Sequence, residues 1–137
     1  MAFLCTRVQA PDEDDYKKLT KVMQYVNCTK DLTLTNEPGD SPHWWVDSSY
    51  AIHPDMRSQH GIIMMLGKGV TYSTSCKQKI NTKSSAKAEL VAMNDVMGQI
   101  LWTKHFLAAQ GIAIPTTTMY QDNNSINTAC REWYHIR

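Results

Sequence analysis

The longest regular pattern in this 137-residue sequence is helical, and it lies between two β-rich regions. From about Ser85 to Gln110, apolar residues recur at helical spacing, and Gly111 follows as a suitable C-terminal stop. We expect the following residues to share one face of this helix: Leu90, Met93, Met97, Leu101, Lys104 and Leu107. Because strand-like segments precede and follow the helix, we expect it to pack on a sheet.

The strand-like segments predict how that sheet is connected. Residues 43–51, 61–66 and 70–75 have the pattern of strands, and the turn at 67–69 (Gly-Lys-Gly) predicts an antiparallel hairpin from the last two. A fourth strand is expected at 116–121, and a weakly helical stretch follows at 123–133. The order β-β-β-α-β-α therefore predicts an α/β fold with a mixed sheet and helices packed on it.

A separate amphipathic helix is expected before the β-rich region. Residues 11–15 form an acidic helix start, and apolar residues then recur at helical spacing up to about Asn27. A short strand is expected at 32–35, and the turn-forming segment 37–42 (Glu-Pro-Gly-Asp-Ser-Pro) predicts a boundary. We therefore divide the chain into a preceding segment, 1–40, and a domain, 41–137.

Composition and charge exclude some classes of protein. The net charge of +1 provides no global field that would attract nucleic acid. Four lysines form a candidate local patch, for which a solvated basic face is an equally good interpretation: Lys77, Lys79, Lys83 and Lys87. No apolar stretch reaches the roughly 20 residues of a membrane span, and the first ten residues lack a signal-peptide pattern.

The cysteines indicate a reducing compartment. None of the four has the spacing of a C-x-x-C pair or of a zinc finger: Cys5, Cys28, Cys76 and Cys130. We interpret them as free thiols. The chain is therefore expected to be intracellular, in the cytoplasm or the nucleus, without a membrane partner and not secreted.

Three acidic residues occupy positions where a carboxylate is unusual or often functional. Asp47 lies inside an apolar strand, Glu89 lies in the first turns of the long helix, and Asp122 ends the fourth strand. Each also has an interpretation without chemistry: an edge position for Asp47, dipole compensation for Glu89 and a helix cap for Asp122. Their joint order along the fold favours a shared site.

The same acids lie in motifs that resemble one family. Three segments are similar to the ribonuclease H domains of copia-type retrotransposons: 44–61 (beginning Trp-Trp-Val-Asp-Ser-Ser-Tyr-Ala), 83–92 (Lys-Ser-Ser-Ala-Lys-Ala-Glu-Leu-Val-Ala) and 120–123 (Tyr-Gln-Asp-Asn). Residues 3–7 and the helix through Tyr25 resemble the tail of the reverse transcriptase that precedes this domain in the Pol polyprotein. The acid order Asp, Glu, Asp favours ribonuclease H over retroelement integrases, which have Asp, Asp, Glu.

The resemblance implies a ribonuclease H-like fold and an endonuclease that cleaves the RNA strand of RNA–DNA hybrids during reverse transcription. It implies two Mg²⁺ ions, or Mn²⁺, with Asp47 bridging both, Glu89 holding one and orienting a substrate 2′-hydroxyl, and Asp122 completing the site. It also implies hybrid-contacting residues: Gln78, Ser84, Ser85 and Asn123. The implied partners are the hybrid and the reverse transcriptase domain of the same polyprotein, in a cytoplasmic virus-like particle or in the nucleus.

The sequence departs from the family in several places. Ala86 and Lys87 stand where the family has threonine and glutamate, and that glutamate fits a capping box with a preceding serine. His60 stands where threonine is common, and we expect His60 at the surface. Residues 127–137 do not match, which suggests a frameshifted tail and a domain that lacks its last elements and its fourth carboxylate. Weak or absent cleavage is therefore expected. The alternatives are an inactive remnant that at most binds nucleic acid, and a purely structural module.

Overall fold

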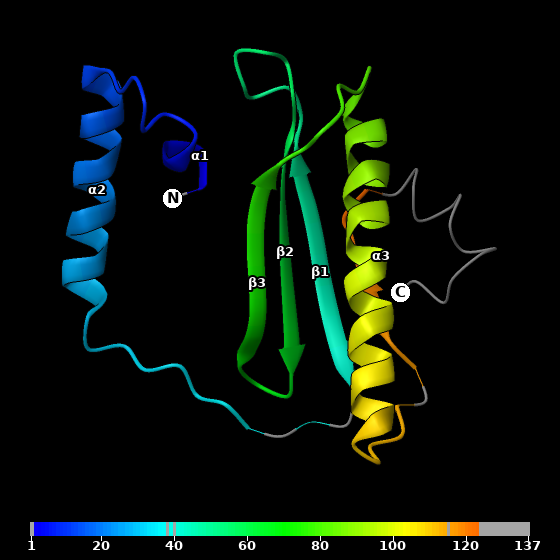
Figure 1. Cartoon of the computed structure of the whole chain (residues 1–137). Coiled ribbons are helices and arrows are strands. Elements are labelled where there is room, and N and C mark those ends of the chain that lie inside the picture. Colours follow the sequence, from blue (N-terminus) through cyan, green and yellow to red (C-terminus); the bar gives the residue numbers. More distant parts are fainter. Residues whose placement is uncertain (1, 38, 40, 115, 124–137) are drawn as a thin grey trace. The chain divides into compact units, whose positions relative to one another are not determined.

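The structure, a computed structural model, describes residues 2–37, 39, 41–114 and 116–123. The chain divides into two compact units, residues 1–34 and 35–137. Their helices and strands (Figure 1) are α1 (Ala2–Cys5), α2 (Glu13–Thr29), β1 (Pro42–Ser49), β2 (Gln59–Leu66), β3 (Val70–Lys77), α3 (Ser85–Ala109) and β4 (Thr118–Tyr120). The α/β class and the order of the elements agree with the prediction through the fourth strand. The helix expected at 123–133 and the mismatched tail lie outside the described residues, apart from Asn123.

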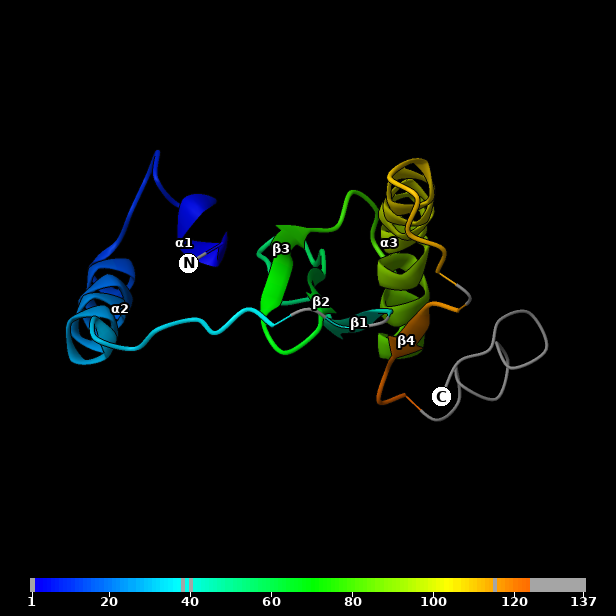
Figure 2. The same ribbon diagram turned by 90° about the horizontal axis from the view of Figure 1, so that it is seen from below.

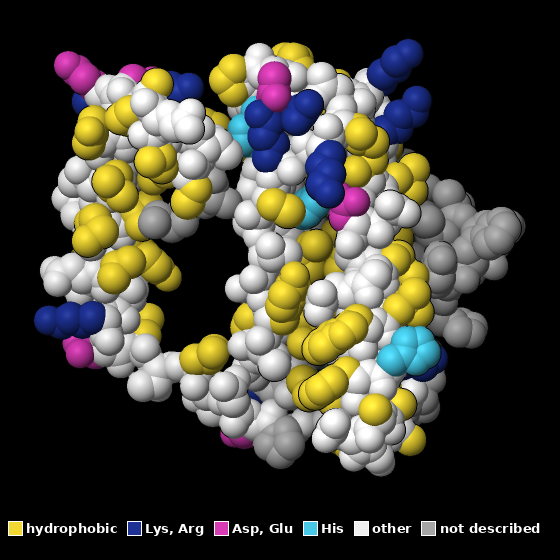
Figure 3. Space-filling view, viewed as in Figure 1, with side chains coloured by type: hydrophobic (Ala, Val, Ile, Leu, Met, Phe, Trp, Pro, Cys, Tyr) yellow, Lys and Arg dark blue, Asp and Glu magenta, His cyan; other side chains and the backbone are white. Residues whose placement is uncertain are grey.

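The first unit is built on a capped helix. The Asp12 carboxylate accepts the backbone N–H of Asp15 at 2.8 Å, and the Asp15 carboxylate accepts that of Asp12 at 3.1 Å. Arg7 Nε donates to Asp15 at 3.1 Å, which neutralises this buried acid. The acidic helix start is thus confirmed as a capping box at the N-terminus of α2. The apolar residues Leu19, Met23 and Val26 stay exposed on α2, and yellow side chains mark this surface in Figure 3.

The second unit is a four-stranded mixed sheet with α3 on one face (Figure 2). The strand order is β3-β2-β1-β4. The two hairpin pairs are antiparallel, whereas β4 runs parallel to β1 after the α3 crossover. A parallel strand needs such a crossover connection, so α3 must lie against the sheet. This topology is compatible with a ribonuclease H-like fold.

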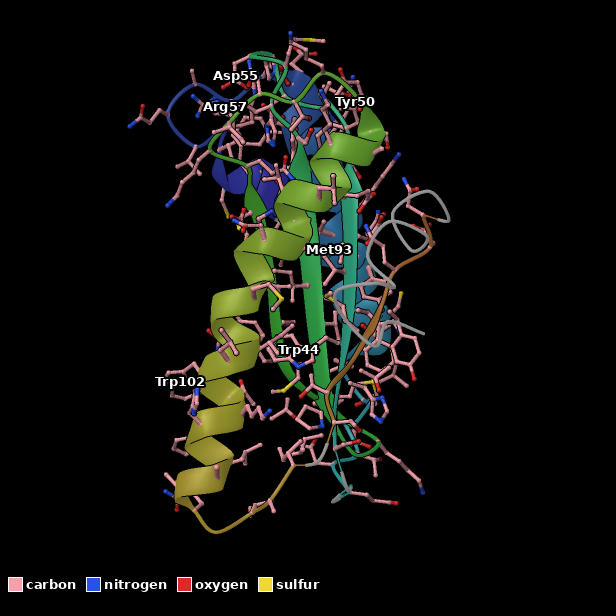
Figure 4. All side chains as sticks on the ribbon, turned by 90° about the vertical axis from the view of Figure 1, so that its right-hand side faces the viewer. Trp44, Tyr50, Asp55, Arg57, Met93 and Trp102 are labelled. Carbon is pink, nitrogen blue, oxygen red and sulfur yellow. The ribbon has the colours of Figure 1, made fainter. Side chains whose placement is uncertain are left out.

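The core lies between α3 and the sheet. Strand alternation places Trp44, Val46 and Ser48 on the buried face of β1, while Trp45 and Asp47 alternate with them and are exposed. In Figure 4, Trp44 and Met93 lie between helix and sheet, and Trp102 points away. The buried apolar cluster consists of Trp44, Val46, Ile62, Met64, Ala92, Met93, Val96, Ile100 and Met119.

The buried face of α3 differs from the predicted one. Met93 and Leu107 are buried as expected, but Leu90 and Leu101 are 45% and 50% exposed. The buried residues are Ala88, Glu89, Ala92, Met93, Val96, Ile100, Thr103 and Leu107. Apolar residues occur on nearly all sides of α3, so their spacing did not predict which face packs on the sheet. The small residues Ala88 and Ala92 let the helix approach β1 closely.

Two further predictions are corrected. His60 is 4% exposed, not a surface residue, because it shares the α3-facing side of β2 with Ile62 and Met64. No strand forms at 32–35, a stretch that pairs with no other strand in the described residues. In addition, the compact units divide between residues 34 and 35, whereas the predicted boundary was at 40/41.

The segment just before β1 belongs with the sheet because it contacts the β2–β3 turn. The Lys68 backbone N–H donates to the Glu37 carbonyl at 3.4 Å, and their side chains form an ion pair at 2.6 Å. A Cβ added to Gly69 would lie 2.6 Å from the Thr35 carbonyl oxygen, so this turn requires glycine. Among the described residues, no helix is both long enough and apolar enough to cross a membrane.

Candidate metal centre

The candidate site lies at an open edge of β1. Strand β4 pairs with β1 only from His43 to Trp45, so within the part of the chain that the structure describes the edge of β1 beyond Trp45 has no strand partner on that side. Asp47 lies on this free stretch, and Asp122 lies two residues after β4 ends. Because β1 and β4 are parallel, their carboxyl ends meet at the same end of the sheet. The topology therefore brings two acids together that are 75 positions apart in the sequence.

Glu89 reaches this edge from the first turns of α3. Its Oε1 accepts the Ser48 backbone N–H at 3.2 Å. Its Oε2 accepts the Gln121 side-chain amide at 2.9 Å. Glu89 is only 4% exposed, and these two donors satisfy its carboxylate. The glutamate thus connects α3, β1 and the end of β4 at one point.

The three carboxylates converge. Asp47, Glu89 and Asp122 each offer one oxygen, and these oxygens all lie within 4.8 Å of one another. Two oxygens bound to the same Mg²⁺ lie at most about 4.2 Å apart, so small side-chain movements would suffice for shared coordination. All three donors are hard oxygens, which suits Mg²⁺, Mn²⁺ or Ca²⁺ and disfavours soft thiophilic metals. This group could therefore hold a divalent cation.

Electrostatics at Glu89 favour a cation as well. Burial raises the pKa of Glu89 above its ordinary value, and the neighbouring charges of Asp47 and Asp122 raise it further. The hydrogen bonds from Gln121 and Ser48 act in the opposite direction. A bound cation would relieve both the like-charge repulsion and the cost of burying the charge. The residues present thus fit an oxygen-ligated metal ion.

The predicted substrate-contacting residues occupy different positions around this cluster. Ser84 is the N-cap of α3, and its side chain accepts the Lys87 backbone N–H at 3.3 Å. Ser85 begins the helix and is exposed, and Asn123 follows Asp122 and is half-buried. These placements leave the predicted contacts to a hybrid as predictions.

Gln78 lies beneath the surface. It is 1% exposed, and its amide donates to the Ala88 carbonyl at 2.8 Å in the first turns of α3. Its backbone N–H donates to the Ser58 carbonyl at 2.8 Å. The Gln78 amide thus holds the start of α3 at Ala88, one position before Glu89, and its contact with a substrate stays a prediction.

The lysine patch is partly neutralised. The Lys77 ammonium lies 2.7 Å from the Asp55 carboxylate, which also faces Arg57 at 3.4 Å. Lys77 chiefly holds the pKa of Asp55 below its ordinary value. Figure 4 shows Asp55 and Arg57 with Tyr50 at the end of the sheet where β1 finishes. The other three lysines, Lys79, Lys83 and Lys87, are exposed.

Two residues at the site were missed from the sequence. Gln121 donates its amide to Glu89, and Ser48 contributes a backbone N–H. The signal for Gln121 was its position directly before Asp122 at the end of a strand, where a polar side chain is aimed at the same edge. Ser48 gave no signal, because a backbone donor depends on the topology and not on the residue type.

The chain was compared with protein-family models and with curated proteins. No family model matches the chain, and no curated protein matches it.

Proposed function

We propose that this chain is the ribonuclease H domain of a copia-type retrotransposon Pol polyprotein, preceded by the tail of its reverse transcriptase. Its activity would be divalent-metal-dependent cleavage of the RNA strand of RNA–DNA hybrids. The observation that carries the proposal is the convergence of Asp47, Glu89 and Asp122, which are distant in sequence. One carboxylate oxygen of each lies within 4.8 Å of the other two. The three motifs that resemble the family contain these same acids.

The proposed roles follow from position and burial. Bound metal would supply a nucleophilic water and stabilise charge on the leaving oxygen. Asp47 and Asp122 are exposed and would hold the ions from the open side of the cluster. Glu89 is held in place by Ser48 and Gln121, so its carboxylate would be fixed before the substrate arrives. Exposed Lys83 and Lys87 flank the start of α3 and would attract the hybrid backbone.

A specific observation favours weak activity or the alternative of a catalytically inactive remnant. The described residues contribute three carboxylates to the cluster, and the Gln121 amide already engages one oxygen of Glu89. Metal would compete with this hydrogen bond. We therefore expect slow cleavage, stronger with Mn²⁺ than with Mg²⁺, because Mn²⁺ binds a given oxygen and nitrogen site more tightly.

The test is single-turnover cleavage of an end-labelled RNA strand paired to DNA, with the RNA duplex and the single strand as substrate controls. Asp47→Asn should reduce cleavage by more than about a hundredfold, because even outer partners of metal ligands are worth 10–100-fold. Asp31→Asn, an exposed acid in the other unit, should leave the rate unchanged. Metal binding without any cleavage would favour the inactive remnant; neither binding nor cleavage would refute the site.

A further inference from the structure

A second group of reactive side chains lies outside the carboxylate cluster. His60 on β2 and Cys76 on β3 are register partners, so their side chains share one face of the sheet. His60 Nε2 lies 2.9 Å from Cys76 Sγ, and His60 Nδ1 lies 3.6 Å from the Oδ2 of Asp95 on α3. A thiol, an imidazole and a carboxylate therefore stand in one chain of polar contacts.

The burial of the three groups differs in a way that suits reaction. His60 is 4% exposed, whereas Cys76 is exposed and the Asp95 side chain is 41% exposed. A reagent in solvent can thus reach the sulfur while the base beside it is shielded from water. Burial lowers the pKa of His60, although Asp95 opposes this effect, so the imidazole is a neutral base at neutral pH.

The geometry distinguishes covalent chemistry from metal binding. Cys76 and Asp95 contact opposite nitrogens of the same imidazole ring. The two nitrogens of a ring point in different directions, so one ion could not take all three residues as ligands. The arrangement instead matches a nucleophile, a base and a group that orients the base. His60 Nδ1 makes no hydrogen bond within the described residues, and it faces the carboxylate of Asp95.

We propose that Cys76 is a nucleophilic thiol, with His60 as its base and Asp95 as the residue that positions His60, and that it is a site of modification by soft electrophiles and peroxides. With hydrogen peroxide, the thiol proton moves to His60 Nε2 and the sulfur attacks one peroxide oxygen. The O–O bond breaks, and the leaving hydroxide takes the proton from His60 to become water. Cys76 is thereby oxidised by two electrons to sulfenic acid, and the peroxide is reduced.

The test uses limited alkylation of the reduced full chain with iodoacetamide at neutral pH, with each cysteine followed by peptide mass spectrometry. Cys5 and Cys28 are exposed and have no histidine partner within the described residues, so they serve as internal references. Cys76 should react at least about tenfold faster than either, a threshold set below the roughly 10²–10⁴-fold that a positioned base contributes. After peroxide treatment, a dimedone adduct should form preferentially at Cys76.

Variants test the separate contributions of His60 and Asp95 to the reactivity of Cys76. His60→Gln should reduce the Cys76 rate to that of Cys5, and Asp95→Asn should slow it several-fold with the reference rates unchanged. The Asp95 position is exposed, so this variant keeps the test decisive if His60→Gln does not fold. Asn94→Ala, the exposed neighbour on α3, should have no effect. Equal rates for Cys76 and the references, or an Asp95→Asn chain that reacts like the parent, would overturn the proposal.

Discussion

Glu89→Gln should stabilise the metal-free protein at neutral pH while abolishing its response to Mg²⁺. Glu89 is buried, and its carboxylate lies within 4.8 Å of two further carboxylates. Glutamine has nearly the same shape, keeps an oxygen that accepts the Ser48 N–H, and carries no charge. The substitution therefore removes the electrostatic cost of the site without creating a cavity.

The magnitude follows from Coulomb's law. At 4.8 Å, the largest separation in the cluster, two like charges repel by about 1 kcal/mol in water and by about 3.5 kcal/mol at an effective dielectric constant of 20. Asp47 and Asp122 are exposed, so the lower value applies to each of the two pairs. The charge-assisted hydrogen bond from Ser48 becomes a neutral one, and the Gln121 amide must turn so that its oxygen accepts from the new side-chain amide. These exchanges together lose about 1 kcal/mol. The net gain in the free energy of unfolding is therefore about 1 kcal/mol.

The pH dependence determines whether Glu89→Gln raises or lowers the free energy of unfolding. Because folding raises the pKa of Glu89, its contribution to stability is complete below its ordinary pKa of about 4.3 and is lost as the pH rises through the higher folded value. The advantage of Glu89→Gln should therefore appear at neutral pH and vanish near pH ~4. Urea unfolding at both pH values, followed by circular dichroism, measures this difference.

Magnesium reverses the order of stability. At about ten times its dissociation constant, a ligand that binds only the folded state adds about 1.4 kcal/mol. The parent chain should gain this amount, and Glu89→Gln should gain none. The reasoning is refuted if the metal-free Glu89→Gln chain is less stable than the parent at neutral pH, or if Mg²⁺ stabilises both chains equally.

Three further predictions concern the scaffold. Trp44→Ala should lower the free energy of unfolding by about 3–5 kcal/mol in urea titrations, because Trp44 is fully buried between α3 and the sheet. Ser84→Ala should cost about 1 kcal/mol by removing the N-cap of α3, whereas Ser85→Ala should be nearly neutral in the same assay. Lys77→Met should raise the pKa of Asp55 toward its ordinary value in an NMR titration, because the Lys77 ammonium chiefly lowers it; an unchanged pKa would contradict the pairing.

Elements with a clear period were predictable from the sequence. The β2–β3 hairpin was marked by a Gly-Lys-Gly turn between two strand-like runs, and the C-terminal end of α3 was marked by Gly111. The convergence of Asp47, Glu89 and Asp122 was also predicted, because the order of elements places the ends of parallel strands and the start of the crossover helix together. Here topology alone was sufficient.

Side-chain orientation was less predictable. On β2, Ile63 and Met65 alternate with Ile62 and Met64, so both faces of the strand are apolar and the sequence did not say which side His60 occupies. On α3, the exposed stacked pair Trp102 and Phe106 has the composition of a core face. These choices depend on which elements pack against each face, which is information that a local pattern does not contain.

The exposed aromatic pair on α3 is one example of an orientation that the sequence did not predict. Trp102 and Phe106 have ring centroids 5.1 Å apart and nearly parallel planes, and Trp102 points away from the sheet (Figure 4). Gln78 gives a second example, since the motif did not predict that its side chain is buried against the first turns of α3. Residue type and motif position predicted which carboxylates converge, but they did not predict which residues hold those carboxylates in place.

Paramagnetic broadening by Mn²⁺ in two-dimensional NMR spectra is the most direct examination of the carboxylate cluster. Substoichiometric Mn²⁺ should broaden the backbone amides of Asp47, Glu89 and Asp122 together, and Asp47→Asn should remove this effect. Broadening confined to the acidic start of α2, around Asp12 and Asp14, or scattered over the surface, would contradict a shared metal site at the edge of β1.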